Sequence, residues 1–261
     1  AISSCFLTGC VNQHPKDSKK SSQGESVETM LEITDPKEKQ AVLNAKAKVK
    51  ALSGNPRIVA TSPAVADICD KLDLDLVGVP KSSVSKIPSR YKKVKKVGLA
   101  MSPDMEIVSS LNPDWILAPS SLETDLKPKF EELKNTEYAF LNLRSVQGMY
   151  RSVQELGEIF GKQQEAEKMT KEFTTFYKSY TKRNKNKKHP KVLVLMGLPG
   201  SYVIATENSY VGSLVKLAGG ENVYQNTDQE FNRQYRGYEE ERTRYHCPCG
   251  TCTSRSGDKN V

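Results

Sequence analysis

A methionine between two predicted elements is the side chain best placed to meet a ligand. Met101 lies in the stretch Val97 to Pro119, where a glycine turn precedes a predicted helix and a short apolar strand. A loop of this kind lies at the edge of an α/β sheet, where such proteins bind their ligands. A methionine more often fills a gap in a hydrophobic core, so the surroundings of Met101 must decide between the two roles.

The helix after Met101 has an expected start and an expected end. Ser102 is expected as its N-cap and Pro103 as its first residue, because a hydroxyl followed by proline is favoured there. Its apolar residues recur at helical spacing, at Met105, Val108 and Leu111. Asn112-Pro113-Asp114 ends this helix and leads into the strand that starts at Trp115.

Cys10 is the second residue with recognisable chemistry. It ends the run Leu7-Thr8-Gly9-Cys10, which matches the bacterial lipobox, in which a cysteine is acylated and becomes the mature N-terminus. The residues before it have the composition of the end of a signal segment, so Cys5 is expected to be removed. A polar tether, Val11 to Ser26, follows. We expect acyl chains such as palmitate on Cys10 to hold an exported protein at the extracellular face of the cell membrane.

A third group, His246-Cys247-Pro248-Cys249 with Cys252, could be interpreted as a zinc site. A zinc site usually has paired ligands across a loop, so one C-x-C-x-x-C beside a histidine favours this interpretation only weakly. The surrounding segment, Asn232 to Val261, contains no Leu, Ile, Met or Phe and cannot form a core. We expect it to be an aberrant, disordered tail.

The overall charge does not indicate nucleic acid as a partner. The 261 residues carry a net charge of +8, much of it in lysine runs at Lys92 to Lys96 and Lys182 to Lys188. Aromatic residues do not alternate with these runs, as they do in nucleic-acid platforms. A solvated face, near an anionic membrane, is the favoured interpretation.

The chain after residue 53 predicts an α/β fold. Strands are predicted at Arg57–Ala60, Leu76–Val79, Trp115–Leu117 and Tyr138–Leu141. A helix capped by Thr61-Ser62-Pro63, one marked by Phe130 and Leu133, and one over Val146–Phe160 lie between or after them. This alternation predicts one parallel sheet with crossover helices.

The pattern then changes to a long helix and a second α/β segment. Gln163 to Lys187 is rich in helix formers, and a rigid connector and a plain surface helix are equally compatible with it. A buried strand is expected over Lys191–Met196, a turn over Gly197–Gly200 and a strand over Tyr202–Ala205. A helix with Val211 and Leu217 follows, ended by Gly219-Gly220.

The predicted organisation has five parts. Residues 1–52 are a signal remnant, lipobox and tether or spacer, in which Thr29 to Leu52 is partly helical and interrupted at Pro36. Residues 53–162 form a first α/β lobe, whose folded body starts near Asn55, and 163–188 form the connecting helix. Residues 189–231 begin a second α/β lobe that is incomplete, and 232–261 are the tail.

The chain resembles the lipid-anchored substrate-binding proteins of ABC importers, which join two Rossmann-like lobes by one long helix. Within that family it is most similar to the haem-binding lipoproteins of Gram-positive haem uptake. The resemblance covers Arg57 to Val223 and rests on RIVATSPAVADICDKLDLDLVGVP, IPSRYKKVKKVGLAMSPDMEIV and HPKVLVLMGLPGSYVIATENSYVGSLVKLAGGENV.

The resemblance implies a set of haem contacts. Met101 occupies the position of a methionine that ligates the haem iron, and a soft thioether suits iron. Haem propionates are expected at backbone N–H groups of Pro63-Ala64 and of the loop Ser82-Ser83. Pro63 has no N–H, so Ala64 must supply more of that contact. Ser83 stands where the family has an aromatic residue. The implied partners are haem, an ABC permease and cell-surface haem-relay proteins.

The second axial ligand of the family, a histidine, has no counterpart. Neither His189 nor His246 can be assigned that role. Codons allowed for Gln234 to Thr253, read one nucleotide later, can spell NTEDMKKNEPDIIVRAEHVL, which contains a histidine where the family has its ligand. We therefore interpret the tail as the product of a shifted reading frame.

These observations predict a binding protein, not an enzyme. The sequence contains no G-x-S-x-G, no G-x-G-x-x-G and no P-loop lysine motif. The leading hypothesis is capture of haem and its delivery to a permease for iron acquisition. A siderophore- or cobalamin-binding lipoprotein of the same fold is the alternative, and it would not use Met101 as a ligand.

Overall fold

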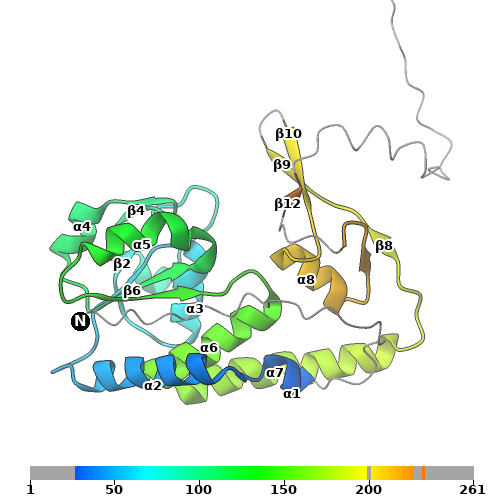
Figure 1. Cartoon of the computed structure of the whole chain (residues 1–261), viewed down its shortest axis with the longest axis horizontal. Helices are drawn as coiled ribbons and strands as arrows, with labels where there is room; N and C mark the ends of the chain where they lie inside the picture. Colours follow the sequence, from blue (N-terminus) through cyan, green and yellow to red (C-terminus); the bar gives the residue numbers. More distant parts are fainter. Residues whose placement is uncertain (1–26, 199–200, 226–230, 233–261) are drawn as a thin grey trace, which may run out of the picture.

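Two α/β lobes lie along one long helix in this protein. The computed structural model describes residues 27–198, 201–225 and 231–232. The long helix, α7 (Gln163–Asn184), runs beneath both lobes, which extend from the same side of it (Figure 1). The expected α/β fold with two lobes joined by one long helix is confirmed. The segments that contain Cys10, Pro199-Gly200 and His246 with its neighbouring cysteines lie outside the described residues.

The first lobe is built on a parallel sheet of five strands, in the order β3-β2-β1-β6-β7. All four neighbouring pairs run parallel. The strands are β1 (Ile58–Ala60), β2 (Leu76–Val79), β3 (Lys95–Lys96), β6 (Trp115–Pro119) and β7 (Glu137–Leu141). Four of the five were predicted. The short edge strand β3 was not, because two lysines carry no strand pattern.

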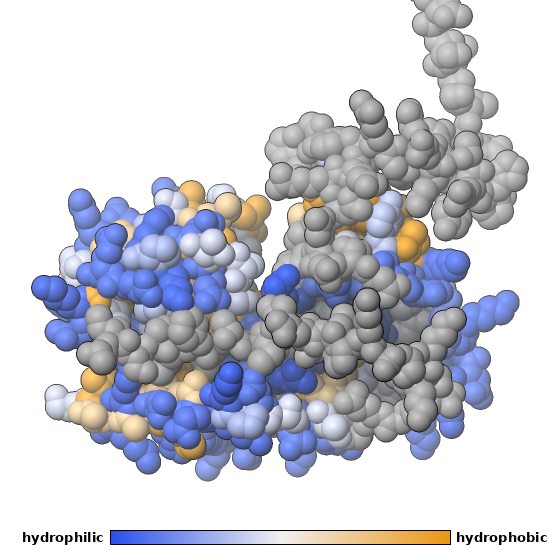
Figure 2. All heavy atoms as spheres, in the orientation of Figure 1, coloured by the Kyte–Doolittle hydropathy of each residue, from blue (hydrophilic) through white to orange (hydrophobic). Residues whose placement is uncertain are grey.

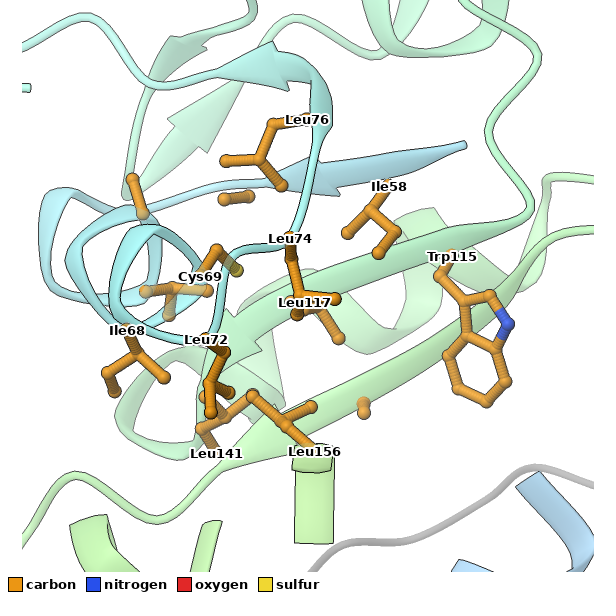
Figure 3. Packing of buried hydrophobic residues seen from close by; sticks show 14 of the residues in the cluster. Ile58, Ile68, Cys69, Leu72, Leu74, Leu76, Trp115, Leu117, Leu141 and Leu156 are labelled. Carbon is orange, nitrogen blue, oxygen red and sulfur yellow. The ribbon is translucent and has the colours of Figure 1, made fainter. Parts of the chain in front are cut away.

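Two hydrophobic clusters cover the two faces of this sheet. Side chains of successive strand residues point to opposite faces, so Ile58 and Ala60 join one cluster and Val59 joins the other. The first cluster packs against α3 (Pro63–Lys71) and α6 (Val146–Phe160) and is drawn in Figure 3. The second packs against α4 (Met105–Ser110) and α5 (Glu123–Glu131). Short 3-10 turns, η1 (Ser89–Tyr91) and η2 (Ser120–Leu122), complete the connections.

Helix boundaries in the first lobe follow local signals. The Ser62 side chain accepts a hydrogen bond from the N–H of Val65 and caps α3, as predicted. Helix α6 begins after the N-cap Ser145 and ends at Gly161, whose φ of 70° is the left-handed conformation that glycine adopts readily. The prediction for α6 is therefore confirmed at both ends.

The stretch expected as a spacer is packed against the first lobe. It forms α1 (Val27–Leu31) and α2 (Pro36–Lys50), with Asp35 as N-cap of the second helix. Val42 and Ala45 are buried in the first cluster, and the α2 helix contacts α6. The folded body thus starts before Asn55, because apolar contacts and ion pairs from Lys46 and Lys48 to Glu158 and Glu137 attach this otherwise polar helix.

The second lobe contains shorter sheets. Strands β9 (Val194–Leu198) and β10 (Ser201–Ala205) form an antiparallel hairpin, which β12 (Phe231–Asn232) extends. Strands β8 (Lys191–Val192) and β11 (Glu221–Asn222) pair in parallel, and α8 (Tyr210–Leu217) packs near them.

The strand expected as buried over Lys191–Met196 is interrupted and partly exposed. It is divided into β8 and β9, and Leu195 and Met196 are 46% and 43% exposed. The reason is that β9 pairs only with β10 among the described residues. The expected burial of this strand is therefore wrong.

A row of aromatic rings connects α7 to both lobes. Tyr150 of α6 stacks on Phe173 with ring centroids 4.5 Å apart, and the row continues through Tyr177 to Tyr180. The Tyr180 hydroxyl donates a 2.7 Å hydrogen bond to the carbonyl of Ala218 at the end of α8. Helix α7 is therefore in contact with both lobes, as the connector interpretation requires.

Candidate ligand-binding site

The residues singled out from the sequence follow three neighbouring strands. Pro63 and Ala64 come after β1, Ser82 and Ser83 come after β2, and Met101 comes after β3. The strands are parallel and adjacent, so their carboxyl ends meet at one edge of the sheet. The structure therefore places all five residues at this edge, where open α/β sheets bind ligands.

Met101 is at the tip of a hairpin, not at the start of a helix. Strands β4 (Gly98–Leu99) and β5 (Ser102–Pro103) pair in antiparallel fashion, with Ala100 and Met101 between them. The Met101 side chain is 73% exposed. A core role, the commoner one for methionine, is thereby excluded.

The predicted cap of the following helix is wrong. Ser102 and Pro103 belong to β5, and the N-cap is Asp104, whose Oδ1 accepts hydrogen bonds from the N–H groups of Glu106 and Ile107. Asp104 accepts two such bonds, and its own N–H donates to the carbonyl of Val97 at the base of the hairpin. The helix therefore starts after Asp104 and not after Ser102.

The hairpin and the serine loop are joined at their base. The backbone N–H of Lys81 donates to the carbonyl of Gly98 at 2.7 Å. Gly98 has a φ of 96°, and a side chain there would lie 2.9 Å from the backbone nitrogen of Asp104. Glycine is therefore required at this turn, and it fixes the Met101 hairpin next to Ser82 and Ser83.

The start of α3 offers backbone donors to an anion. N–H groups of a first helical turn have no acceptor within the helix. Pro63 supplies none, Ser62 already binds the N–H of Val65, and Ala64 is exposed. The N–H of Ala64 is thus a donor that the first turn of α3 can present to a ligand.

Two apolar residues at this edge were missed from the sequence. Val84 is 97% exposed in the loop after β2, and Leu99 is 58% exposed in the hairpin. With Met101, they are large apolar residues exposed in two loops that a hydrogen bond between Lys81 and Gly98 joins. Figure 2 shows hydrophobic residues on the first lobe, on the side toward the second lobe. Their place in predicted loops was the available signal, since large apolar residues in loops are often ligand contacts.

The second lobe contacts the first lobe on the side where the strands of the first sheet have their carboxyl ends. Helix α6 follows the carboxyl end of β7, and the N–H of Val146, its first residue, donates to the Oγ of Ser213 in α8. A ligand bound at the edge would accordingly lie toward the second lobe.

Comparison with known proteins identifies the family. A model of the family described as periplasmic binding protein matches residues 58–237. The chain belongs to the periplasmic binding protein family.

The relatives of this periplasmic binding protein include haem-uptake proteins. The high-affinity heme uptake system protein IsdE of Staphylococcus aureus strain Newman is 41% identical over 180 residues, which are 69% of this chain. The chain spans 61% of the length of that curated relative.

Solved structures show the same likeness. An ABC transporter substrate-binding protein from Listeria monocytogenes EGD-e is 44% identical with a TM-score of 0.66, covering 72% of each chain. Staphylococcus aureus IsdE complexed with heme is 40% identical with a TM-score of 0.63, covering 68% of this chain and 69% of that one. The vitamin B12 binding protein BtuF of Vibrio cholerae, 15% identical with a TM-score of 0.60 over 70% and 72%, shares the fold. The heme uptake protein and the ABC transporter substrate-binding protein agree with the expectation of a binding protein and not an enzyme.

Other side chains of this periplasmic binding protein that could act as ligands lie away from the carboxyl edge of the sheet. His189 is next to α8, where its Nδ1 lies 2.7 Å from the carbonyl oxygen of Gly219. Cys69 is fully buried, and burial raises the pKa of its thiol to about 12, so it is not available as a ligand. No cluster of three His, Cys, Asp or Glu that could hold a metal ion exists in the described part of the chain.

A hollow of about 650 Å³ lies elsewhere, between α1, α6 and α7. Its lining includes Glu28, Glu32, Glu158 and Glu167, which are unsuited to an anionic macrocycle. Among the described helices of this periplasmic binding protein, none combines the length and the apolar character needed to cross a membrane.

Proposed function

We propose that this periplasmic binding protein captures haem at the outer face of the cell membrane and passes it to an ABC permease. The observation that supports this most directly is the position of Met101, a thioether that is 73% exposed at the carboxyl edge of the sheet. An exposed methionine at a ligand-binding edge has little structural purpose, whereas its sulfur is a good ligand for haem iron.

The surroundings of Met101 match the other parts of haem. Val84 and Leu99 are exposed apolar groups that can cover the macrocycle. The N–H of Ala64 and the loop Ser82-Ser83 can bind a propionate, aided by the positive end of the α3 dipole. Strands β3 and β1 are two positions apart in the sheet, which separates their ends by about 10 Å. One flat ligand can therefore contact Met101 and the start of α3 together.

The similarity to the heme uptake protein IsdE supports haem over other ligands of the fold. A siderophore or cobalamin is the alternative, because the vitamin B12 binding protein BtuF shares the architecture. The two hypotheses differ at Met101, since only haem binding uses its sulfur as an axial ligand.

A substitution series at Met101 tests the proposal. Haemin is titrated into the full chain while the Soret band is recorded. Met101→Leu keeps an apolar side chain of similar size but removes the ligand, so it should weaken haemin binding at least about tenfold and shift the band. Met101→His restores a ligand and should recover most of the affinity, with an altered spectrum.

The control is Leu99→Ala, which removes an apolar contact but leaves the iron ligand, so the position of the band should stay the same. If Met101→Leu binds haemin with the affinity and spectrum of the parent chain, the assignment of Met101 is wrong. If the parent chain binds cobalamin or a ferric siderophore more tightly than haemin, the alternative replaces the proposal.

The membrane location rests on Cys10, and a second experiment tests it. Cys10→Ser should release the protein from the membrane fraction of an expressing bacterium into the medium, because acyl chains provide the anchor. Cys5→Ser is the matched control and should stay with the membrane. Retention of the Cys10→Ser protein in the membrane fraction would contradict the lipid anchor.

A further inference from the structure

The end of helix α7 and the residues that directly follow it carry a dense group of positive charges. From Phe173 to Thr206 the sequence contains no Asp or Glu. The segment 182–188, which we name the basic end of α7, contains five basic residues, and all of them are exposed: Lys182, Arg183, Lys185, Lys187 and Lys188.

These charges are not neutralised by the fold. Glu28, which lies beside α7, forms its ion pair with Lys178, outside the basic end. Within the described part of the chain, no carboxylate forms a salt bridge with any of the five residues of the basic end. A solvated lysine face usually alternates with acidic residues, so an uncompensated group of this density indicates an anionic partner.

An exposed aromatic residue shares the helix face that leads to the basic end. Phe176 is 59% exposed, and Arg183, seven residues later, lies on the same side of α7. An aromatic group beside lysines on one helix face is typical of binding to a membrane surface, where the ring enters the headgroup region.

The position of the N-terminal segment favours a membrane over another polyanion. Glu28 of α1 forms its ion pair with Lys178, one turn before the basic end. Val27 lies seventeen positions after Cys10, and whatever its conformation the intervening chain spans at most about 60 Å. A lipid on Cys10 would therefore keep the basic end of α7 within reach of the bilayer.

We infer that the basic end of α7, with Phe176, is a docking surface for an anionic lipid bilayer. This inference rests on the proposed membrane location but not on Cys10 itself, because the charges act with or without acyl chains. Both lobes extend from the same side of α7 (Figure 1). Docking through the helix end thus orients the body on the membrane and leaves the other ends of the lobes in solvent.

The test is vesicle co-sedimentation of the full, non-acylated Cys10→Ser chain. Vesicles contain either phosphatidylcholine alone or phosphatidylcholine with phosphatidylglycerol. Each basic side chain near an anionic surface multiplies binding by a factor of about five. The triple variant Lys185→Gln, Lys187→Gln, Lys188→Gln should therefore bind phosphatidylglycerol vesicles about a hundred-fold less tightly, and added salt should weaken the parent chain.

The matched control removes the same number of exposed charges from the first lobe: Lys92→Gln, Lys93→Gln and Lys95→Gln. It should bind nearly as well as the parent chain. If both triple variants lost the same vesicle affinity, binding would depend on net charge and not on the basic end of α7, and the inference would fail. It would also fail if the parent chain bound neutral vesicles equally well, did not bind vesicles, or bound single-stranded DNA more tightly than vesicles. Because the tested chain has no acylated cysteine, these outcomes do not depend on whether Cys10 carries a lipid in the parent protein.

Discussion

The backbone N–H of Val146 donates a 3.1 Å hydrogen bond to the Oγ of Ser213. Val146 begins helix α6 in the first lobe, and Ser213 belongs to α8 in the second. Val146 is 3% exposed, so this donor has no ready replacement from water. The contact sets the second lobe against the edge that carries Met101.

Ser213→Ala should loosen the contact between the lobes. The buried N–H of Val146 would lose its acceptor, at a cost of about 1–3 kcal/mol. Hydrogen exchange followed by mass spectrometry should show faster exchange in the first turn of α6. Ser179→Ala, on the exposed side of α7, is the control and should leave exchange unchanged. Unchanged protection of α6 in Ser213→Ala would show that the bond does not hold the lobes together.

Ala64→Pro should weaken haemin binding by removing one backbone donor. Proline is tolerated in the first turn of a helix, so α3 should persist, which circular dichroism can verify. A lost hydrogen bond to a carboxylate costs about 1.5–3 kcal/mol, or roughly ten- to a hundred-fold in affinity.

The ligand itself provides the control for this substitution. Haemin dimethyl ester has no propionate charge, so its affinity should be nearly equal for the parent chain and for Ala64→Pro. The Ala64 contact is disproved if both ligands lose affinity equally.

Glu155→Gln should stabilise the protein at neutral and alkaline pH. Glu155 is 2% exposed, and burial together with the neighbouring Glu38 raises its pKa from 4.5 to about 9, against the opposing effect of Arg151. The unfolded chain loses this proton near pH 4.5 while the folded chain keeps it, so stability falls as pH rises between these values. The neutral glutamine removes that loss.

The difference should be measured by urea unfolding over the same pH range. The free energy of unfolding of Glu155→Gln should exceed that of the parent chain by a difference that grows by at most about 1.4 kcal/mol per pH unit. This difference should be absent near pH 4.5. Glu158→Gln is the control on the same helix, because hydrogen bonding to Lys46 lowers the pKa of Glu158 and reverses the sign. Parallel stability curves for the parent chain and Glu155→Gln would contradict the prediction.

Leu195→Thr with Met196→Thr should reduce aggregation of the chain. Both side chains are more than two fifths exposed on a strand that pairs on one side only among the described residues. Exposed apolar strands are sites of association between molecules. Light scattering of the concentrated protein should fall in this variant. In contrast, Val203→Thr changes a buried position of β10 and should lower stability without improving solubility.

Several elements could be predicted because their signals are local. Helix α6 has a capping serine, an apolar stripe and a terminal glycine, and it was predicted at both ends. The position of Met101 at the sheet edge was predicted from the loop, helix and strand around it, whereas the contacts of Ala64 and Ser82 were implied by the resemblance to the family. Such patterns depend on the period of the backbone and need no knowledge of distant contacts.

Other features depend on contacts that the sequence does not display. The hairpin at Met101 replaced the predicted helix start because Gly98 bonds to Lys81 and because Asp104 competes as a cap. The packing of α2 depends on Val42, Ala45 and Val49 and on ion pairs from Lys46 and Lys48 to the first lobe. The ligand contacts proposed for Val84 and Leu99 required the exposure that the structure shows, because a place in a predicted loop does not by itself tell whether an apolar side chain is exposed.

The single tryptophan of the chain lies in the core of the first lobe. Trp115 is 1% exposed in β6, and its indole meets the ring of Phe160 edge-on at 5.6 Å (Figure 3 shows the indole in the cluster). Its fluorescence therefore reports on the first lobe alone. Emission at tryptophan wavelengths would follow the melting of that lobe, while far-ultraviolet dichroism would average both. Any gap between the two transitions would measure how far the lobes unfold as separate units.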